Sequence, residues 1–211
     1  PRRTLYKREP KLKVYPVTVV NLLGKDGDFE VDSNSDGLAD GWLAWAWSGV
    51  TPTFALATDR MFGSKAQKIV CTTTKTSPVT GGWYRDIYAT NSVVYYSTYL
   101  KINNIPSGGS IVFGTDSGTV RTYTTNNGWM RVSNSMTLNG SATLYCVSYQ
   151  FVSPDGSPVS AEFLTDGCML INLTEMGQLP PPLKEYFNNA VSNWADLATT
   201  SDITAIDGKK Q

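Results

Sequence analysis

Acid and amide side chains at alternate positions are the clearest sign of chemistry in this sequence. They lie in the stretch DSNSDGLADGW, residues 32–42, and the candidate calcium ligands are Asp32, Asn34, Asp36, the main-chain carbonyl of Leu38, and Asp40. Calcium takes about six to eight oxygen ligands from a short, bendable loop, so this spacing predicts a structural calcium site. An EF-hand is not expected, because Leu43 stands where that motif needs a bidentate Glu. The alternative is an Asp/Asn/Gly turn without a metal.

More carboxylates lie just upstream, at Asp26, Asp28 and Glu30. Carboxylates this close together repel one another unless a cation or water screens them, and either role is structural. The chain has no histidine, which excludes Ser-His-Asp and Cys-His catalysis in their usual forms. A retaining glycosidase needs two carboxyl groups about 5–5.5 Å apart, and the sequence contains no second paired cluster of acids. We therefore expect a protein that is not an enzyme.

Aromatic side chains indicate a binding surface. As a strand, SVVYYSTYLKI would carry Tyr95 and Tyr99 on one face, about 13 Å apart at ~3.3 Å per residue. Flat rings in a row suit stacking on sugar rings, and TGGWYRDIY adds two more rings after a glycine pair. The candidate carbohydrate-binding residues are Trp83, Tyr84, Tyr95 and Tyr99; the alternative is that they are core residues or cross-strand pairs. At least two of the clustered Trp42, Trp45 and Trp47 are expected in the core or an interface.

Short β-strands must position these side chains. From about residue 14 to 176, runs of β-branched and aromatic residues alternate with Gly, Pro, Asn and Ser turn signals such as LNGS, which predicts an antiparallel β-sandwich. The three cysteines are widely spaced and form no CxxC pair, so they are expected to be reduced, buried thiols and not zinc ligands. No run approaches the ~20 apolar residues of a membrane span.

The two ends of the chain differ from this central part. Residues 1–13 hold six of the 18 basic residues, which is typical of an arm that packs on another chain. After GQLPPP, an apolar stripe predicts a short helix; it consists of Leu183, Phe187, Val191 and Trp194. The expected organisation is a basic N-terminal arm (1–18), a β-sandwich (19–176), and a Pro-rich linker, short helix and polar tail (177–211). Lys+Arg and Asp+Glu balance at 18 each, so nucleic acid is not an expected partner.

Five stretches in order resemble the jelly rolls of carbohydrate-binding modules. They are NLLGKDGDFEVDSNSDGLADGW, GSKAQKIV, VVYYSTYLKI, GWMRVSNSMTL and FLTDGCMLINLTEM, and together they span about residues 19 to 176. The resemblance implies an all-β, antiparallel jelly-roll β-sandwich with an extended N-terminal arm and a short C-terminal helix. In that family a structural calcium is often bound by a first-strand Glu and a closing-strand Asp. The matching positions are Glu30 and Asp166, which are an alternative to the 32–40 loop as the metal site.

The end of the sequence adds a second resemblance. CMLINLTEMGQLPPPLKEYFNNAV resembles a segment of phage tail, fibre and other virion proteins, with Met176 where an aromatic residue is usual. This implies a non-enzymatic virion structural protein of a bacteriophage, in a tail, baseplate, fibre or capsid decoration, assembled in the host cytoplasm. Its expected partners are other virion chains, through residues 1–13 and 177–211, and host-surface glycans. The alternative is a carbohydrate-binding module of a larger glycan-active protein.

Overall fold

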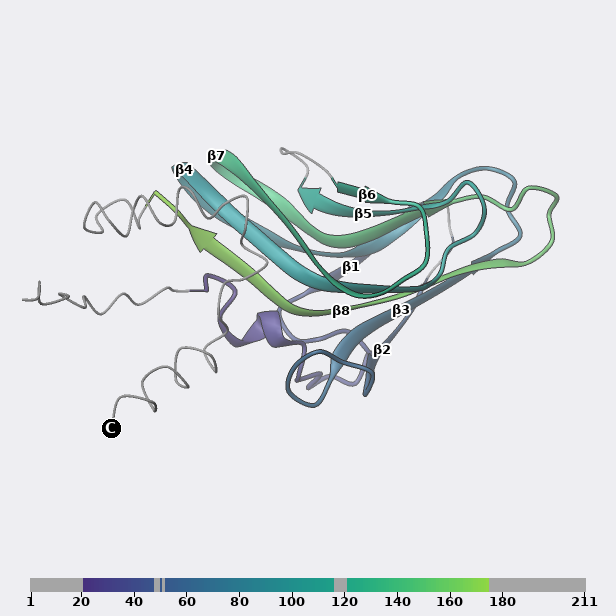
Figure 1. Cartoon of the computed structure of the whole chain (residues 1–211), viewed down its shortest axis with the longest axis horizontal. Coiled ribbons are helices and arrows are strands. Elements are labelled where there is room, and N and C mark those ends of the chain that lie inside the picture. The colour runs from purple at the N-terminus through teal and green to yellow at the C-terminus, as the bar shows by residue number, and fades with distance from the viewer. Residues whose placement is uncertain (1–20, 48–49, 51, 116–120, 175–211) are drawn as a thin grey trace, which may run out of the picture.

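The computed structural model describes residues 21–47, 50, 52–115 and 121–174, which form an all-β, antiparallel jelly-roll β-sandwich (Figure 1). One 3-10 helix precedes the strands. The elements are η1 (Gly24–Asp28), β1 (Leu43–Trp47), β2 (Thr53–Ala57), β3 (Ala66–Thr73), β4 (Val79–Asn104), β5 (Ser110–Thr115), β6 (Arg121–Tyr123), β7 (Asn127–Phe151) and β8 (Val159–Asn172). The predicted fold class is confirmed for this part of the chain; the predicted N-terminal arm and C-terminal helix lie outside the described residues.

The two long strands, β4 and β7, pair with each other along most of their length and link the two layers. Their register shifts between Ala89 and Ser92, where Asn91 has a φ of 47°. The first half of β4 pairs with β1 and with the end of β7, which continues to β5 and β6; we call this layer the first sheet. The second half of β4 pairs with the start of β7 and with β8, which continues to β3 and β2; this layer is the second sheet.

Aromatic residues fill the space between the sheets. Trp83 of the first sheet is fully buried and stacks on Phe163 of the second, with ring centroids 5.6 Å apart. Tyr96 of the second sheet packs against Phe113 of the first at 4.9 Å. Fully burying one such ring stabilises the fold by about 1.5–3 kcal/mol. Since side chains alternate along a strand, Tyr96 in the core places Tyr95 and Tyr99 on the outer face, as the sequence predicts.

Strand length is the main difference from the sequence-based expectation. The stretch SVVYYSTYLKI is not a separate strand but the second half of β4. The turn signal LNGS, residues 138–141, lies inside β7, where Leu138 pairs with Ser92 and Gly140 with Ala89. Residues 138–141 therefore stay in β7 and pair with β4, although their sequence favours a turn, because the two strands bend together at this point.

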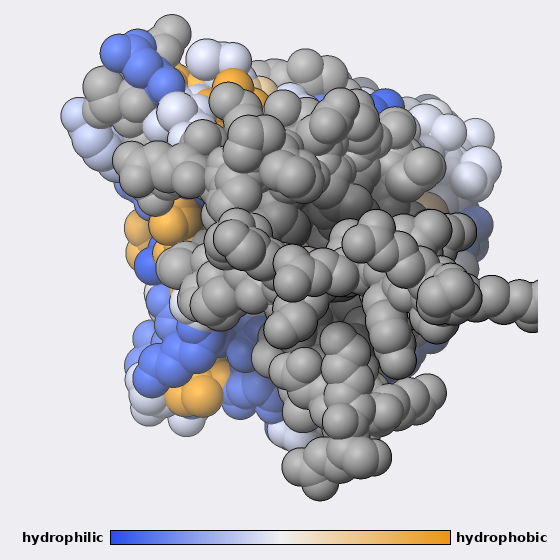
Figure 2. All heavy atoms as spheres, turned by 60° about the vertical axis from the view of Figure 1, so that its left-hand side comes forward, coloured by the Kyte–Doolittle hydropathy of each residue, from blue (hydrophilic) through white to orange (hydrophobic). Residues whose placement is uncertain are grey.

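The first and last described residues lie at the same end of the sandwich. The Leu22 N–H donates to the Leu170 carbonyl at 2.8 Å, and the Asn21 side chain accepts from the Leu170 N–H at 3.0 Å. On the face drawn in Figure 2, apolar residues form small, separate orange patches among hydrophilic ones. Within the described residues, no helix has the length and apolar character needed to cross a membrane.

Candidate functional site

The 32–40 loop is held by its own side chains. The two Asp32 carboxylate oxygens accept from the backbone N–H groups of Asp36 at 3.2 Å and Gly37 at 2.9 Å. The Asn34 side-chain oxygen accepts from the same Asp36 N–H at 3.2 Å, and the Asn34 side-chain nitrogen donates to the Asp36 carboxylate at 3.0 Å. Asp40 closes the loop by accepting from the Ser33 N–H and hydroxyl. The side chains of residues 32, 34 and 36 therefore converge on one turn.

Two further features fix this loop on the second sheet. Gln67 of β3 is fully buried, and its Oε1 accepts from the Ala39 N–H at 2.7 Å while its Nε2 donates to the Gly37 carbonyl at 2.9 Å. Gly37 has a φ of +86°, and a Cβ there would lie 2.2 Å from the Phe54 carbonyl oxygen. Only glycine combines this backbone angle with this close approach, so the turn is tied to β2 and β3.

Glu30 and Asp166, the alternative metal pair, meet at the loop that links β2 to β3. Asp166 is fully buried and accepts from the N–H groups of Met61 and Phe62, each at 2.7 Å. Glu30 accepts from the Ser64 N–H at 2.8 Å. Burial raises the pKa of the Asp166 carboxyl despite these hydrogen bonds, and the charge of Glu30 adds to the rise. Burial opposes the charge of Glu30 too, but its hydrogen bonds outweigh that effect and lower its pKa.

At both candidate metal sites, carboxylate oxygens already accept hydrogen bonds from the backbone. Glu30 Oε1 already accepts two backbone N–H groups, and so does Asp166 Oδ2, so both oxygens point at donors and not toward a common centre. In the 32–40 loop, both Asp32 oxygens and the Asn34 side-chain oxygen also accept backbone N–H groups, while Asp40 Oδ2 takes part in none of these hydrogen bonds. No three His, Cys, Asp or Glu side chains in the described residues are grouped to hold a metal. A calcium set in the loop would therefore need the Asn34 side-chain oxygen and the Leu38 carbonyl as well, and these hydrogen bonds favour neither candidate site over the other.

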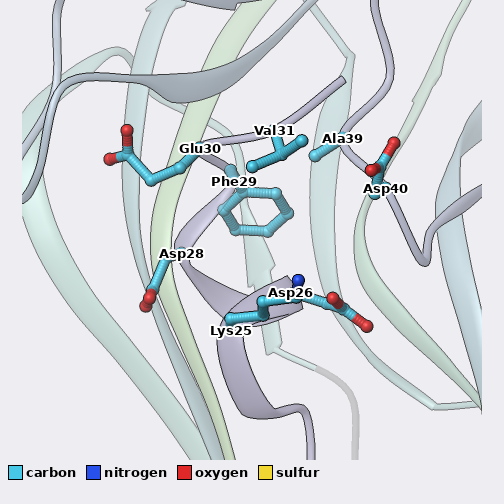
Figure 3. A pocket seen from close by; sticks show the side chains of 8 residues that line it. All are labelled: Lys25, Asp26, Asp28, Phe29, Glu30, Val31, Ala39 and Asp40. Carbon is cyan, nitrogen blue, oxygen red and sulfur yellow. The ribbon is translucent and has the colours of Figure 1, made fainter. Parts of the chain in front are cut away.

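A shallow hollow lies between the two acidic stretches. It is lined by Lys25, Asp26, Asp28, Phe29, Glu30, Val31, Ala39 and Asp40. Figure 3 shows the Phe29 ring at its centre, with the carboxylates of Asp28 and Glu30 on one side and those of Asp26 and Asp40 on the other. Burial, and then the charge of Glu30, raise the pKa of Asp28. Asp26 is paired with Arg85 at 2.6 Å. The carboxylates on the two sides of the Phe29 ring point away from one another in Figure 3.

Two of the four predicted sugar-binding residues are buried. Trp83 lies in the core, 0% exposed, with Phe29, Phe54 and Phe163 around it. The core packing that stabilises the sandwich encloses the whole Trp83 ring in this structure, and a sugar contact of Trp83 stays a prediction. Tyr95 faces away from the core but is only 1% exposed, so its ring is also closed to a ligand in this structure.

The other two predicted residues keep partial exposure but lie on different sheets. Tyr99 is on the outer face of the second sheet, where the Phe62 ring packs edge-on against it at 5.2 Å. The Arg131 guanidinium lies over the same ring at 6.0 Å from its centroid. Tyr84 is on the outer face of the first sheet, next to Trp83 in sequence and therefore pointing away from the core. The four predicted residues thus do not form one site.

An aromatic surface that the sequence reasoning missed lies around Tyr84. Strand β1 pairs with β4 so that Leu43 is opposite Tyr84, Trp45 opposite Gly82 and Trp47 opposite Thr80. Opposite residues of an antiparallel pair share a face, so Trp45 and Trp47 lie on the same face as Tyr84, two and four residues along the strand from it. Tyr88, four residues along β4, belongs to the same face. We call the set Trp45, Trp47, Tyr84 and Tyr88 the aromatic face.

The aromatic face is open to solvent and carries polar groups. Trp47 is 70% exposed and Tyr88 74%. The Trp45 and Trp47 rings meet edge to face with centroids 5.4 Å apart. Asp86 lies between Tyr84 and Tyr88, and the exposed Gln150 of β7 is opposite Thr80. Alternating Leu-Ala-Trp-Ala-Trp was the sequence signal for this surface, since it places both tryptophans on one side of a strand.

The fold is similar to that of known carbohydrate-binding modules. No protein-family model and no curated protein matches the chain. Among solved structures, TmCBM61 in complex with β-1,4-galactotriose is 12% identical over 72% of this chain and 99% of its own, with a TM-score of 0.42. The family 11 module of the cellulosomal cellulase Lic26A-Cel5E of Clostridium thermocellum is 12% identical, with 75% and 96% covered and a TM-score of 0.45. The CBM22-1 xylan-binding domain of Paenibacillus barcinonensis Xyn10C is 17% identical, with 63% and 85% covered and a TM-score of 0.37. The jelly-roll assignment rests on the strand order and pairing of this chain itself.

Proposed function

We propose that this chain is a non-catalytic carbohydrate-binding module and that the aromatic face is its binding surface. The observation that carries the proposal is the exposure of Trp47 and Tyr88 on a face that also holds Trp45 and Tyr84. An exposed aromatic ring loses water-contacting apolar area when the C–H face of a sugar packs on it. Neighbouring groups such as Asp86 and Gln150 supply hydrogen-bond partners for sugar hydroxyls.

The dimensions of the aromatic face favour an extended ligand. Trp47 is opposite Thr80, which lies eight residues before Tyr88 on the same strand. At ~3.3 Å per residue, the two ends of the face are about 26 Å apart. The rings lie on a sheet surface and not in an enclosed cavity, so the proposed ligand is a stretch of polysaccharide that runs along the strands and not a single terminal sugar.

The experiment is a screen of immobilised polysaccharides and glycans with the purified chain, followed by titration calorimetry on the best ligand. Trp47→Ala and Tyr88→Ala should each weaken binding about tenfold or more without lowering the melting temperature, because neither ring is buried in the core. Tyr99→Ala, on the other sheet, is the matched control and should keep the affinity. Loss of binding with Tyr99→Ala alone would move the site to the second sheet, and no binding to any glycan would refute the proposal.

A role in a phage virion is the second candidate function. It is supported by the resemblance of the segment that starts at Cys168 and by the position of Asn21 and Thr174 at one end of the sandwich. The predicted contact segments, residues 1–13 and 177–211, lie outside the described residues; in this role they would contact neighbouring virion chains, and the aromatic face would contact host-surface glycans. Mass spectrometry of purified particles tests this role; a chain absent from the particles would favour a module of a larger glycan-active protein.

Calcium belongs to the proposal as a structural ion of the 32–40 loop. Oxygen ligands from Asp32, Asn34 and Asp36 converge on one exposed turn, which suits a hard cation. At 100 times its dissociation constant, calcium would stabilise the fold by about 2.7 kcal/mol, or about 5–10 °C in melting temperature. The shift should disappear in Asp36→Asn and persist in Asp155→Asn, a carboxylate of another loop that also accepts a backbone N–H. A shift abolished only by Glu30→Gln would assign the ion to the alternative site.

A further inference from the structure

Among the residues that the structure describes, strand β1 is an edge strand of the first sheet. Within the described residues it pairs with β4 and with no other strand. Its outer face carries Leu43, 52% exposed, and Trp47, 70% exposed. Ala44 and Ala46 point to the opposite face and are exposed as well. A strand at the centre of a sandwich would have one face covered, so β1 extends beyond the second sheet and meets solvent on both faces.

The sequence around β1 lacks the features that normally protect such an edge. Residues 41–57, GWLAWAWSGVTPTFALA, contain no charged side chain. Within Leu43–Trp47 there is no proline and no glycine, and the register with β4 is continuous, without a bulge. Exposed edge strands in monomers are usually blunted by lysines, prolines or bulges, because a flat apolar edge is a template for pairing with another strand.

We propose that β1 pairs antiparallel with β1 of a second copy of this chain, which joins two first sheets into one continuous sheet across a two-fold axis. In this register Ala44 of each copy is opposite Ala46 of the other, and the Leu43 and Trp47 side chains of the two copies face each other. Aliphatic–aromatic cross-strand pairs of this kind stabilise antiparallel sheets. The contact is the same patch on both copies, as a closed dimer requires.

A second copy fits this edge better than a charged partner does. The chain as a whole has 18 basic and 18 acidic residues, so two copies have no net repulsion. The edge itself is neutral and offers nothing for an acidic or basic peptide to recognise. Edge pairing also leaves both faces of the sheet uncovered, so the aromatic faces of the two copies would lie side by side on one surface, with Trp47 of each copy next to Leu43 of the other.

Sedimentation equilibrium of the full chain, without any glycan, tests the proposal. The wild-type chain should be a dimer at high concentration, and the double variant Ala44→Lys, Ala46→Lys should raise the dissociation constant about tenfold or more, because it puts like charges directly opposite each other. The double variant Ala44→Glu, Ala46→Glu should do the same. An equal mixture of the lysine and glutamate variants should restore the dimer, which only pairing of β1 with β1 explains.

The matched control is Thr122→Lys, an exposed residue of β6 at the other edge of the first sheet, and it should leave the dimer unchanged. Circular dichroism and melting temperature should match the wild type for all variants, because the substituted side chains are exposed. A chain that is monomeric up to millimolar concentration would overturn the proposal. So would a dimer that survives both double variants, since it would then form through another part of the chain, or a mixture that stays monomeric.

Discussion

Replacing Gln67 by Leu tests whether one buried amide holds the 32–40 loop on the second sheet. The change keeps the side-chain volume but removes the partner of the Ala39 N–H, which belongs to a residue only 2% exposed, and of the Gly37 carbonyl. A buried polar group left without a hydrogen bond costs about 1–3 kcal/mol, so two such groups cost about 2–6 kcal/mol. Burying a leucine side chain in place of the amide stabilises the folded state by about 1–2 kcal/mol. These ranges leave a net loss of unfolding free energy of about 0–5 kcal/mol, or about 2.5 kcal/mol at their midpoints.

Urea unfolding followed by tryptophan fluorescence measures this loss. The midpoint should fall while the slope with urea stays constant, because the surface exposed on unfolding does not change. Gln150→Leu is the control: the same substitution at an exposed position of β7 should change stability by less than about 0.5 kcal/mol. If Gln67→Leu were as stable as Gln150→Leu, the Gln67 hydrogen bonds would not be what holds the loop.

Two further predictions concern the backbone and the pH dependence of stability. Gly37→Ala should lose about 1–3 kcal/mol more than Gly108→Ala in urea unfolding, because both glycines have positive φ but only Gly37 faces a carbonyl oxygen, 2.2 Å from the added Cβ; equal losses would contradict the clash. Burial raises the pKa of Asp166 above its value in the unfolded chain, so the native state binds the proton more readily. Its contribution to stability therefore falls as pH rises from about 4 through the folded-state pKa. Asp166→Asn should remove this contribution from the pH dependence of the melting temperature between pH 3 and 7. The same pH dependence in the variant and the wild type would contradict the prediction.

The fold could be predicted from the sequence because strand alternation is a local signal. Val94, Tyr96 and Leu100 share one face of SVVYYSTYLKI, and the structure buries all three in the core. The continuity of β4 through Asn91 could not be predicted the same way. Its φ of 47° and the matching bend in β7 depend on pairing between residues about 50 positions apart, and such pairing leaves no trace in a short window of sequence.

The candidate site was harder to predict because an aromatic residue looks the same in a core and on a surface. Trp83 and Tyr84 are adjacent in sequence, yet one is enclosed between the sheets and the other lies on the outer face. Of the clustered tryptophans, Trp42 is buried and Trp47 is 70% exposed. Trp83 and Tyr84 differ in which side of β4 faces the second sheet, whereas Trp42 precedes β1 and Trp47 lies at its far end, opposite Thr80.

In this structure, the carboxylates of the acidic stretches accept hydrogen bonds from the backbone of the chain. Asp32, Glu30 and Asp166 each accept backbone N–H groups of segments that lie outside the strands. Such N–H groups have no partner in a sheet ladder and must find one elsewhere, and a carboxylate provides a strong, charge-assisted bond. The 32–40 loop is therefore already ordered by its own hydrogen bonds. Chelation of the proposed calcium should lower the melting temperature without unfolding the chain, and a chain that unfolds completely in chelator would show that the ion, and not this hydrogen-bond network, holds the loop.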